Sequence, residues 1–195
     1  MSARWAVLPN LDYAYRKLAK TKFIYVAETA RCGAGIFAAR DFQAGQLILR
    51  DDDGDYYDGA INYAQVRALG IDMSRYCFQI DHDRFLLPHG SIDDLINHSC
   101  RPNAGIRLTA QGYDLLALSD VAVGEELTYD YSTYIASPER LSCCCGAAVC
   151  RGEIGRFVDL NLRLQAYYVE QGVVGAFALA ESSPVEAAAA RRRAV

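Results

Sequence analysis

The sequence predicts a mainly β domain with short helices, and three observations support this fold class. From Phe23 onward, short runs of β-branched, aromatic and aliphatic residues alternate with turn residues. The length of 195 residues fits one domain with short additions. Hydrophobic residues make up 52% of the chain, which is ample for a folded core and argues against global disorder.

The expected strands follow one another with turns such as Gln43–Gly45 between them. The fourth and fifth should pair as a hairpin, and so should the sixth and seventh, which flank a turn near Gln111 and Gly112. The expected strands are Phe23–Ala27, Gly35–Ala39, Gln46–Arg50, Tyr76–Ile80, Arg84–Leu87, Gly105–Thr109, Tyr113–Leu118 and Glu126–Tyr129.

Two helices are expected outside these strands. Ile61–Leu69 should be a helix stopped by Gly70, and Val158–Gln171 is periodic enough for a second. The apolar segment Val173–Leu179 either covers the core or forms an interface, and the first is more usual.

The acidic stretch Asp51–Asp58 (DDDGDYYD) raises the question of a calcium loop. It lacks the regular ligand spacing and the terminal glutamate of such a loop. We therefore expect a solvated turn.

Charge and hydropathy limit the kinds of partner. The net charge of -4 argues against a general DNA binder held by phosphate contacts, and is compatible with a basic protein partner. There is no run of about 18 or more apolar residues, and no basic-then-apolar leader at the start. We therefore expect no membrane and no direct nucleic-acid partner, with a cytoplasmic location or the nucleus of its own or a host cell.

The cysteines predict a metal site. Seven is an odd number, and four of them fall within eight residues as Cys143, Cys144, Cys145 and Cys150. A local cluster favours metal over a disulfide framework. Cys143, Cys145 and Cys150 give the spacing Cys-x-Cys-x4-Cys, one thiolate short of the four that structural zinc prefers. Cys100 is the natural candidate for the fourth.

Two further short segments are rich in glycine or in polar side chains. Cys32–Phe37 (CGAGIF) lacks the third glycine and the following helix of a dinucleotide fingerprint, so it predicts a turn where bare backbone approaches a ligand. Asn97–Asn103 (NHSCRPN) places two amides, an imidazole, a hydroxyl and a thiol in seven residues. Alone, it is also explained by a polar turn whose side chains satisfy the local backbone.

Together with Gly124–Tyr131 (GEELTYDY) and the cysteine cluster, these motifs resemble the SET-domain family of protein-lysine methyltransferases. The resemblance runs from about Phe23 to about Gly152. It implies small curved β-sheets with a C-terminal pseudoknot, a zinc-binding post-SET loop and a C-terminal helix. The implied divisions are a helical preamble (1–22), the SET domain (23–135), the post-SET segment (136–155), the helix (156–180) and a disordered tail (181–195).

The resemblance also implies roles for individual residues. The methyl donor S-adenosylmethionine would be bound by Gly33, Gly35, Ile36, Phe37, Asn97, His98 and Ile154. Structural zinc would be held by Cys100, Cys143, Cys145 and Cys150, while Cys144 is an extra thiol that could compete for the metal. The threaded last strand would bring Tyr131 beside Asn97 and His98.

By the same resemblance, Tyr131 is the expected catalytic tyrosine, and Tyr129 occupies what resembles the family's product-specificity position. A hydroxyl at Tyr129 predicts mono- or dimethylation over trimethylation. The expected substrate is a protein lysine, in a basic protein or a histone tail. Two alternatives remain open: a SET fold acting on a small-molecule amine, and a zinc-stabilised binding module without catalysis.

Overall fold

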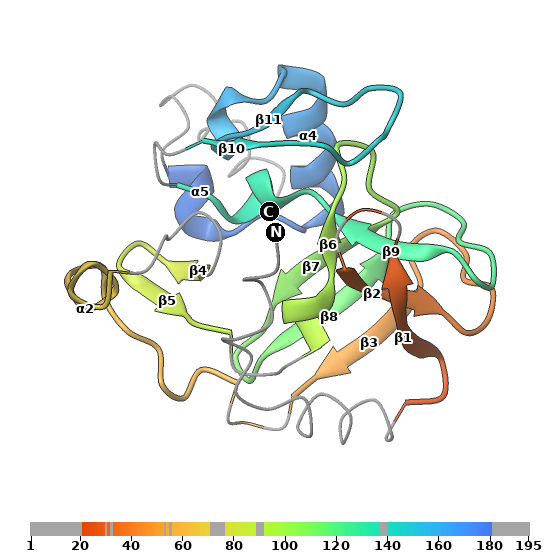
Figure 1. The fold of residues 1–195 in the computed structure, drawn as a ribbon, viewed down its shortest axis with the longest axis horizontal. Coiled ribbons are helices and arrows are strands. Elements are labelled where there is room, and N and C mark those ends of the chain that lie inside the picture. Colours follow the sequence, from red (N-terminus) through yellow and green to blue (C-terminus); the bar gives the residue numbers. More distant parts are fainter. Residues whose placement is uncertain are drawn as a thin grey trace.

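The computed structural model describes residues 21–29, 31, 33–52, 54, 56–70, 77–88, 92–136 and 140–180. Small sheets dominate this part of the chain, and the helices are short (Figure 1). The expected preamble and tail fall almost wholly outside the described residues. The strands are β1 Ile24–Thr29, β2 Gly33–Ala38, β3 Leu47–Asp51, β4 Phe78–Asp81, β5 Arg84–Leu86, β6 Asn97–His98, β7 Ala104–Leu108, β8 Tyr113–Ala117, β9 Glu126–Tyr129, β10 Leu141–Ser142 and β11 Glu153–Ile154.

The helical elements lie between and after the strands. Both predicted helices are present as α2 and α4, and the short helix α5 follows α4 within the segment 156–180. The α-helices are α2 Tyr63–Ala68, α4 Leu162–Gln171 and α5 Ala176–Ala180, and the 3-10 turns are η1 Ile92–Leu95, η2 Tyr131–Tyr134 and η3 Phe157–Asp159.

The strands form a four-stranded sheet in the order β1-β2-β9-β6, a three-stranded sheet β3-β8-β7, and the hairpins β4-β5 and β10-β11. Both predicted hairpins are confirmed, with Phe78 opposite Leu86 in one and Ala104 opposite Ala117 in the other. In the first sheet β9 lies between β2 and β6, strands that precede it by about 90 and 30 positions. This insertion is the arrangement that the expected pseudoknot requires.

One apolar core joins the two larger sheets. Ile36 and Leu127 from the first sheet, and Ile106 and Leu115 from the second, are fully buried in the same cluster. Burying such a side chain contributes about 1.5–3 kcal/mol. The core therefore fixes the strands on which the polar motifs lie.

The C-terminal segment closes the core. Val173 and Phe177 are buried, and Gly105 leaves the room that the side chain of Val173 fills. The apolar segment Val173–Leu179 therefore covers the core, as expected. The β10-β11 hairpin and α4 lie together at the top of the view in Figure 1.

Three sequence predictions need correction. The helix expected over Val158–Gln171 begins only at Leu162, because Leu160 is extended and the side chain of Asn161 caps the new helix. The acidic stretch Asp51–Asp58 is not simply solvated, because Asp51 and Tyr56 are buried. The CGAGIF glycines lie in β2 itself, since Gly33 pairs with Thr29 and Gly35 with Ala27.

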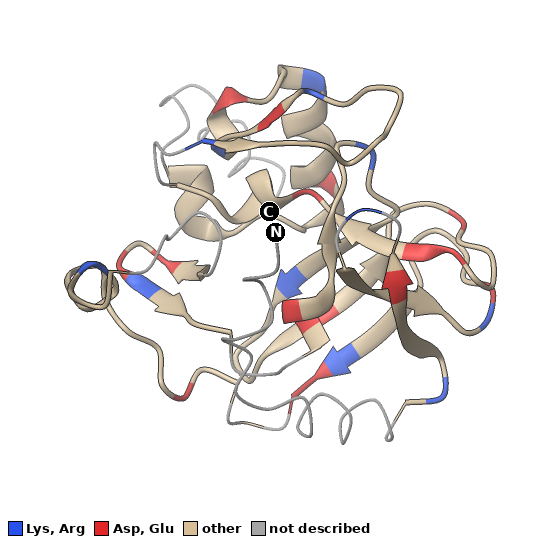
Figure 2. Cartoon of the chain, in the orientation of Figure 1, with Lys and Arg blue, Asp and Glu red and all other residues tan. Residues whose placement is uncertain are grey.

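Surface charge is mixed, with acidic and basic residues interspersed along the described chain (Figure 2). No helix within these described ranges is long and apolar enough to cross a membrane.

Candidate active site and metal centre

The parallel pair β6–β9 assembles the candidate site. Asn97 lies opposite Thr128, and His98 lies opposite Tyr129. The backbone N–H of Tyr131 donates to His98 Nδ1 at 3.2 Å, and the two rings are 5.3 Å apart. Residues more than thirty positions apart in the sequence thus form one cluster, as the predicted threading required.

Gly35 is required by the side chains that pack against it. A Cβ there would lie 2.6 Å from Glu126 Oε1 and 2.9 Å from Asn97 Nδ2. Asn97 Nδ2 donates to Glu126 Oε1 at 2.8 Å and to the carbonyl of Ala34 at 2.9 Å. The glycine therefore lets a polar side chain of β6 reach the backbone of β2.

The pairing of β9 changes partner beside this glycine. β9 pairs with β2 through Leu127 and Glu126, and with β6 through Thr128 and Tyr129. The described part of β2 before Ile36 pairs with β1 alone. Gly33 is exposed, whereas Gly35 is buried beneath the side chains of Asn97 and Glu126, so of these two glycines only Gly33 has backbone that is accessible to a ligand.

Asn103 holds β9 in place. Its Nδ2 donates to the carbonyl of Glu126 at 2.9 Å, and its Oδ1 accepts from the N–H of Thr128 at 3.0 Å. A single side chain thus satisfies two backbone groups of the strand that leads to the tyrosines.

The two tyrosines at the end of β9 differ in environment. Their rings are 4.7 Å apart. The Tyr131 hydroxyl donates to the carbonyl of Ile96 at 2.9 Å, which fixes the direction of its O–H bond. Burial, followed by the nearby Tyr131 and Asp93, raises the pKa of Tyr129 well above its usual range, so this phenol stays protonated.

His98 is a neutral ring in this environment. Burial lowers the pKa of His98 to about 4, against an opposing effect of Asp130. Since Nδ1 accepts from Tyr131, the neutral ring carries its hydrogen on Nε2, which lies 3.4 Å from Cys100 Sγ. His98 therefore links the tyrosine segment to the thiols.

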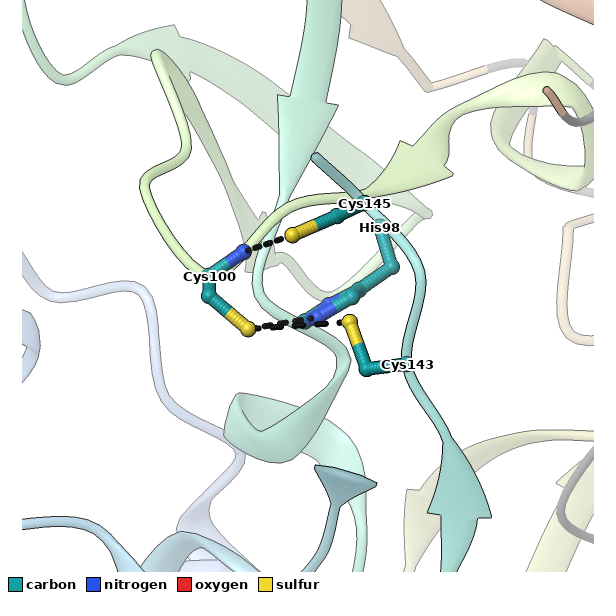
Figure 3. Close-up of side chains that lie close together, drawn as sticks. All are labelled: His98, Cys100, Cys143 and Cys145. Atoms are coloured by element: carbon teal, nitrogen blue, oxygen red, sulfur yellow. Dashed lines mark hydrogen bonds between the residues drawn. The ribbon is translucent and has the colours of Figure 1, made fainter. Parts of the chain in front are cut away.

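The cysteine motif and Asn97–Asn103 meet in a cluster of thiols and one imidazole (Figure 3). The potential ligand atoms of His98, Cys100, Cys143 and Cys145 lie within 4.8 Å of one another. Cys143 Sγ is 3.7 Å from Cys100 Sγ and 3.7 Å from Cys150 Sγ. Tetrahedral zinc with bonds of about 2.3 Å separates its thiolates by about 3.8 Å, so these spacings fit the ion.

Cys144 is exposed and lies outside this group of potential ligands. The strand before Cys143 and the strand after Gly152 pair as β10-β11, and Cys143 N donates to the carbonyl of Gly152. The hairpin therefore closes the base of the cysteine loop while the thiols point inward.

Two arginines tie the cysteine loop to the sheet. Arg31, beside the glycine motif, donates to the carbonyl of Cys145 at 2.8 Å. Its guanidinium occupies the place where a Cβ on Gly146 would lie. Arg151, next to Cys150, forms a two-pronged ion pair with the buried Asp130.

The structure thus brings together most of the residues that the sequence singled out. Asn97, His98, Tyr129, Tyr131 and the thiols form one region. Ile154 is buried in β11, and Phe37 lies in the paired part of β2, so their predicted contact with a cofactor stays a prediction.

Sequence reasoning missed the polar residues that support this region. Glu126, Asp130 and Asn103 lie inside the quoted motifs, yet none was assigned a role. Their signal was weak, because a carboxylate or amide beside a tyrosine is also an ordinary surface residue. Only the fold shows that Asp130 is buried.

Comparison with known proteins agrees with this geometry. The SET domain family model matches residues 33–132, about half of the chain. The chain is 34% identical over 155 residues to "Histone-lysine N-methyltransferase ATX2" of Arabidopsis thaliana, covering 73% of this chain and 14% of that protein. It is 32% identical over 157 residues to "Histone-lysine N-methyltransferase 2B" of Homo sapiens, covering 70% of this chain and 5% of that protein.

The chain therefore belongs to the SET-domain family. It spans only about a seventh of the length of the first of these relatives. A solved structure, KRYPTONITE in complex with mCHG DNA and SAH, is similar over 67% of this chain and 28% of that chain, with 25% sequence identity and a TM-score of 0.49.

Proposed function

We propose that the protein is an S-adenosylmethionine-dependent protein-lysine N-methyltransferase. The observation that carries the proposal is the parallel β6–β9 pair, which joins Asn97, His98 and Tyr131 beside the glycine segment of β2. The relatives named histone-lysine methyltransferases support the same activity.

The proposed methyl donor binds at Gly33, Gly35, Asn97 and His98, with Ile36, Phe37 and Ile154 as further contacts. Methyl transfer from a sulfonium to an amine is an in-line displacement, so positioning dominates catalysis. The Tyr131 hydroxyl donates to the carbonyl of Ile96, which fixes the position of its oxygen beside His98 for contact with the incoming amine.

The amine has to lose its proton before it attacks, since a free lysine has a pKa of about 10.4. A narrow aromatic channel lowers that pKa by desolvation. The adjacent, mutually tilted rings of Tyr129 and Tyr131 support such a channel. Tyr131 orients the amine and does not act as a strong base.

Structural zinc is proposed at Cys100, Cys143, Cys145 and Cys150. Cys150 Sγ lies 3.7 Å from Cys143 Sγ but outside the group of mutually close ligand atoms, in which the fourth residue is His98. His98 Nε2, however, carries a hydrogen while Nδ1 accepts from Tyr131. That hydrogen suits a donor to the Cys100 thiolate better than a metal ligand. Bound zinc would hold the cysteine loop against the sheet.

The test is transfer of a radiolabelled methyl group to basic proteins, to a histone H3 peptide and to free lysine. We expect label in a protein lysine and a loss of about 100-fold or more with Tyr131→Phe, the size of a lost transition-state contact. Label in free lysine instead would favour the small-molecule alternative. Donor binding without any transfer would favour the binding module.

The degree of methylation of the product is a separate proposal. We propose mono- or dimethylation, because the Tyr129 hydroxyl forms no hydrogen bond with the described residues and is available to a water or to the amine. One relative is named a "Histone H3-lysine(4) N-trimethyltransferase", so mass spectrometry of the products decides. We expect Tyr129→Phe to increase the trimethylated fraction; ready trimethylation by both proteins would contradict the assignment.

The substrate class is proposed to be a lysine in a basic segment such as a histone tail, which matches the acidic net charge. A nuclear site of action, in its own or a host cell, follows from that substrate.

A further inference from the structure

Asp130, a buried carboxylate, stands between the two proposed active-site tyrosines in the sequence. Asp130 is 1% exposed, and its side chain accepts from the Tyr168 hydroxyl at 3.1 Å and from the N–H of Ser132 at 3.1 Å. A buried charge needs such partners, because losing water is costly. Asp130 is thus fixed from η2 and from α4 together.

The strongest partner comes from the cysteine loop. Arg151 Nη1 and Nη2 lie 2.7 Å from the two carboxylate oxygens of Asp130. Parallel charge-assisted hydrogen bonds of this kind define direction as well as distance. Nη2 also donates to Ser132 Oγ at 3.2 Å, so Arg151 contacts the residues on both sides of Tyr131.

The same arginine is part of the thiol cluster. It follows Cys150 directly, and its backbone N–H donates to Cys100 Sγ at 3.4 Å. Within one residue, the backbone therefore contacts a proposed zinc ligand and the side chain contacts the segment that carries the tyrosines.

We propose that Arg151 is a positioning residue that couples the cysteine loop to Tyr129 and Tyr131 through Asp130. The inference rests on the proposed function for its catalytic consequence. When the loop is ordered, Arg151 fixes Asp130. The adjacent backbone of Tyr131 then holds its side chain where the hydroxyl donates to the carbonyl of Ile96. Coupling between two sites is reciprocal, so the tyrosine segment also stabilises the metal-bound loop.

The alternative is an ion pair that only stabilises the fold. The two explanations differ in what changes while the protein is still folded. A purely stabilising pair alters the melting temperature and leaves turnover by the folded fraction unchanged. A positioning pair lowers kcat and weakens zinc retention in protein whose circular dichroism is native.

The experiment compares Arg151→Met, Arg151→Lys and the matched control Arg140→Met in the zinc-loaded protein. Arg140 lies at the base of the same loop and forms exposed ion pairs with Glu153 and Asp159. For Arg151→Met we expect kcat to fall about 30-fold, while the KM for the histone H3 peptide stays within about 3-fold of the wild-type value. Zinc should be lost to a chelator about 10-fold faster. Arg151→Lys should give a kcat and a rate of zinc loss between those of the wild type and Arg151→Met. Arg140→Met should match the wild type in both.

A double-mutant cycle with Asp130→Asn and Arg151→Met tests the coupling without turnover. Each single change leaves a buried partner unsatisfied, so the double variant should lose less zinc affinity than the two losses combined. Additive losses, or a kcat for Arg151→Met within about 3-fold of wild type, would overturn the proposal. If the wild type transfers no methyl group, the proposed function fails, whereas the zinc cycle still decides the coupling.

Discussion

The β1-β2-β9-β6 sheet and the cysteine loop 142–152 obtain their geometry in different ways. The sheet is fixed by backbone ladders and by an apolar core in which Ile36 and Leu127 are fully buried. Regular structure touches the loop only where its ends join the β10-β11 hairpin. Between those ends, thiols and two arginines supply its contacts with the rest of the molecule.

This difference indicates that the structure of the cysteine loop depends on bound metal, whereas that of the sheet does not. The sheet can form from the chain alone, because its polar groups find partners inside it. Without a cation, burial raises the pKa of the Cys100 and Cys143 thiols, so both stay protonated and contact each other only weakly. Zinc binding replaces such protons and adds strong bonds that close the loop. Metal should therefore control the loop and leave the sheet largely intact.

The largest expected effect comes from removing the metal. Chelation, or Cys143→Ser, should lower methyl transfer more than 100-fold, while circular dichroism of the sheet changes little. Zinc content is measured in parallel, and Cys144→Ser is the control because Cys144 is exposed and outside the cluster. Full activity in metal-free protein would show that the loop closes without the ion.

The next largest effect is expected for Gly35→Ala, which changes the packing within the β1-β2-β9-β6 sheet. The added Cβ would meet Glu126 Oε1 at 2.6 Å and displace Asn97, so we expect affinity for S-adenosylmethionine to fall at least 10-fold by calorimetry. Gly45→Ala is the control: it has nothing within 4 Å and only a strained φ of +82. Normal donor affinity in Gly35→Ala would remove Asn97 and Gly35 from the donor site.

A smaller effect is expected for Asn103→Ala. The substitution leaves the carbonyl of Glu126 and the N–H of Thr128 without their partner, which should cost about 1–3 kcal/mol of unfolding free energy. Urea denaturation measures the loss. Asn161→Ala, which removes the cap of α4, should cost about 1 kcal/mol and spare donor binding. Equal losses of donor affinity in both variants would argue against a special role for Asn103.

The smallest effect is expected for Arg31→Ala. Its single exposed hydrogen bond to Cys145 should hold the loop only weakly, so we expect the KM for S-adenosylmethionine to rise a few-fold. Faster amide exchange over residues 143–150 should accompany it. Arg101→Ala, on an exposed residue after Cys100, serves as the comparison. A loss as large as that of Cys143→Ser would mean that Arg31 shapes the metal site itself.

Much of this architecture could be predicted from the sequence. Alternation and turn residues located the hairpins, and the spacing of Cys143, Cys145 and Cys150 indicated a metal site. The resemblance to the SET-domain family implied that Tyr131 would meet Asn97 and His98. The divisions at 23–135, 136–155 and 156–180 stay predictions.

The contacts that fix these motifs could not be predicted in the same way. Local pattern carries no information about which carboxylate is buried, so Asp130 looked like any polar residue in a strand. The role of Arg151 depends on a contact across 21 positions. Asn97, the packing partner of Gly35, lies 62 positions later in the chain, so the local sequence does not show why a glycine is needed there.

The place of β9 between β2 and β6 also constrains how the molecule is made. The β1–β2 hairpin can form as soon as it leaves the ribosome, yet its neighbour is synthesised about 90 residues later. At about 5–20 residues per second, that edge waits several seconds for its strand. During that interval β2 is open to other chains, and β6 joins it for about the last 30 residues of synthesis, so a nascent protein halted before β9 would be a target for chaperones and for aggregation.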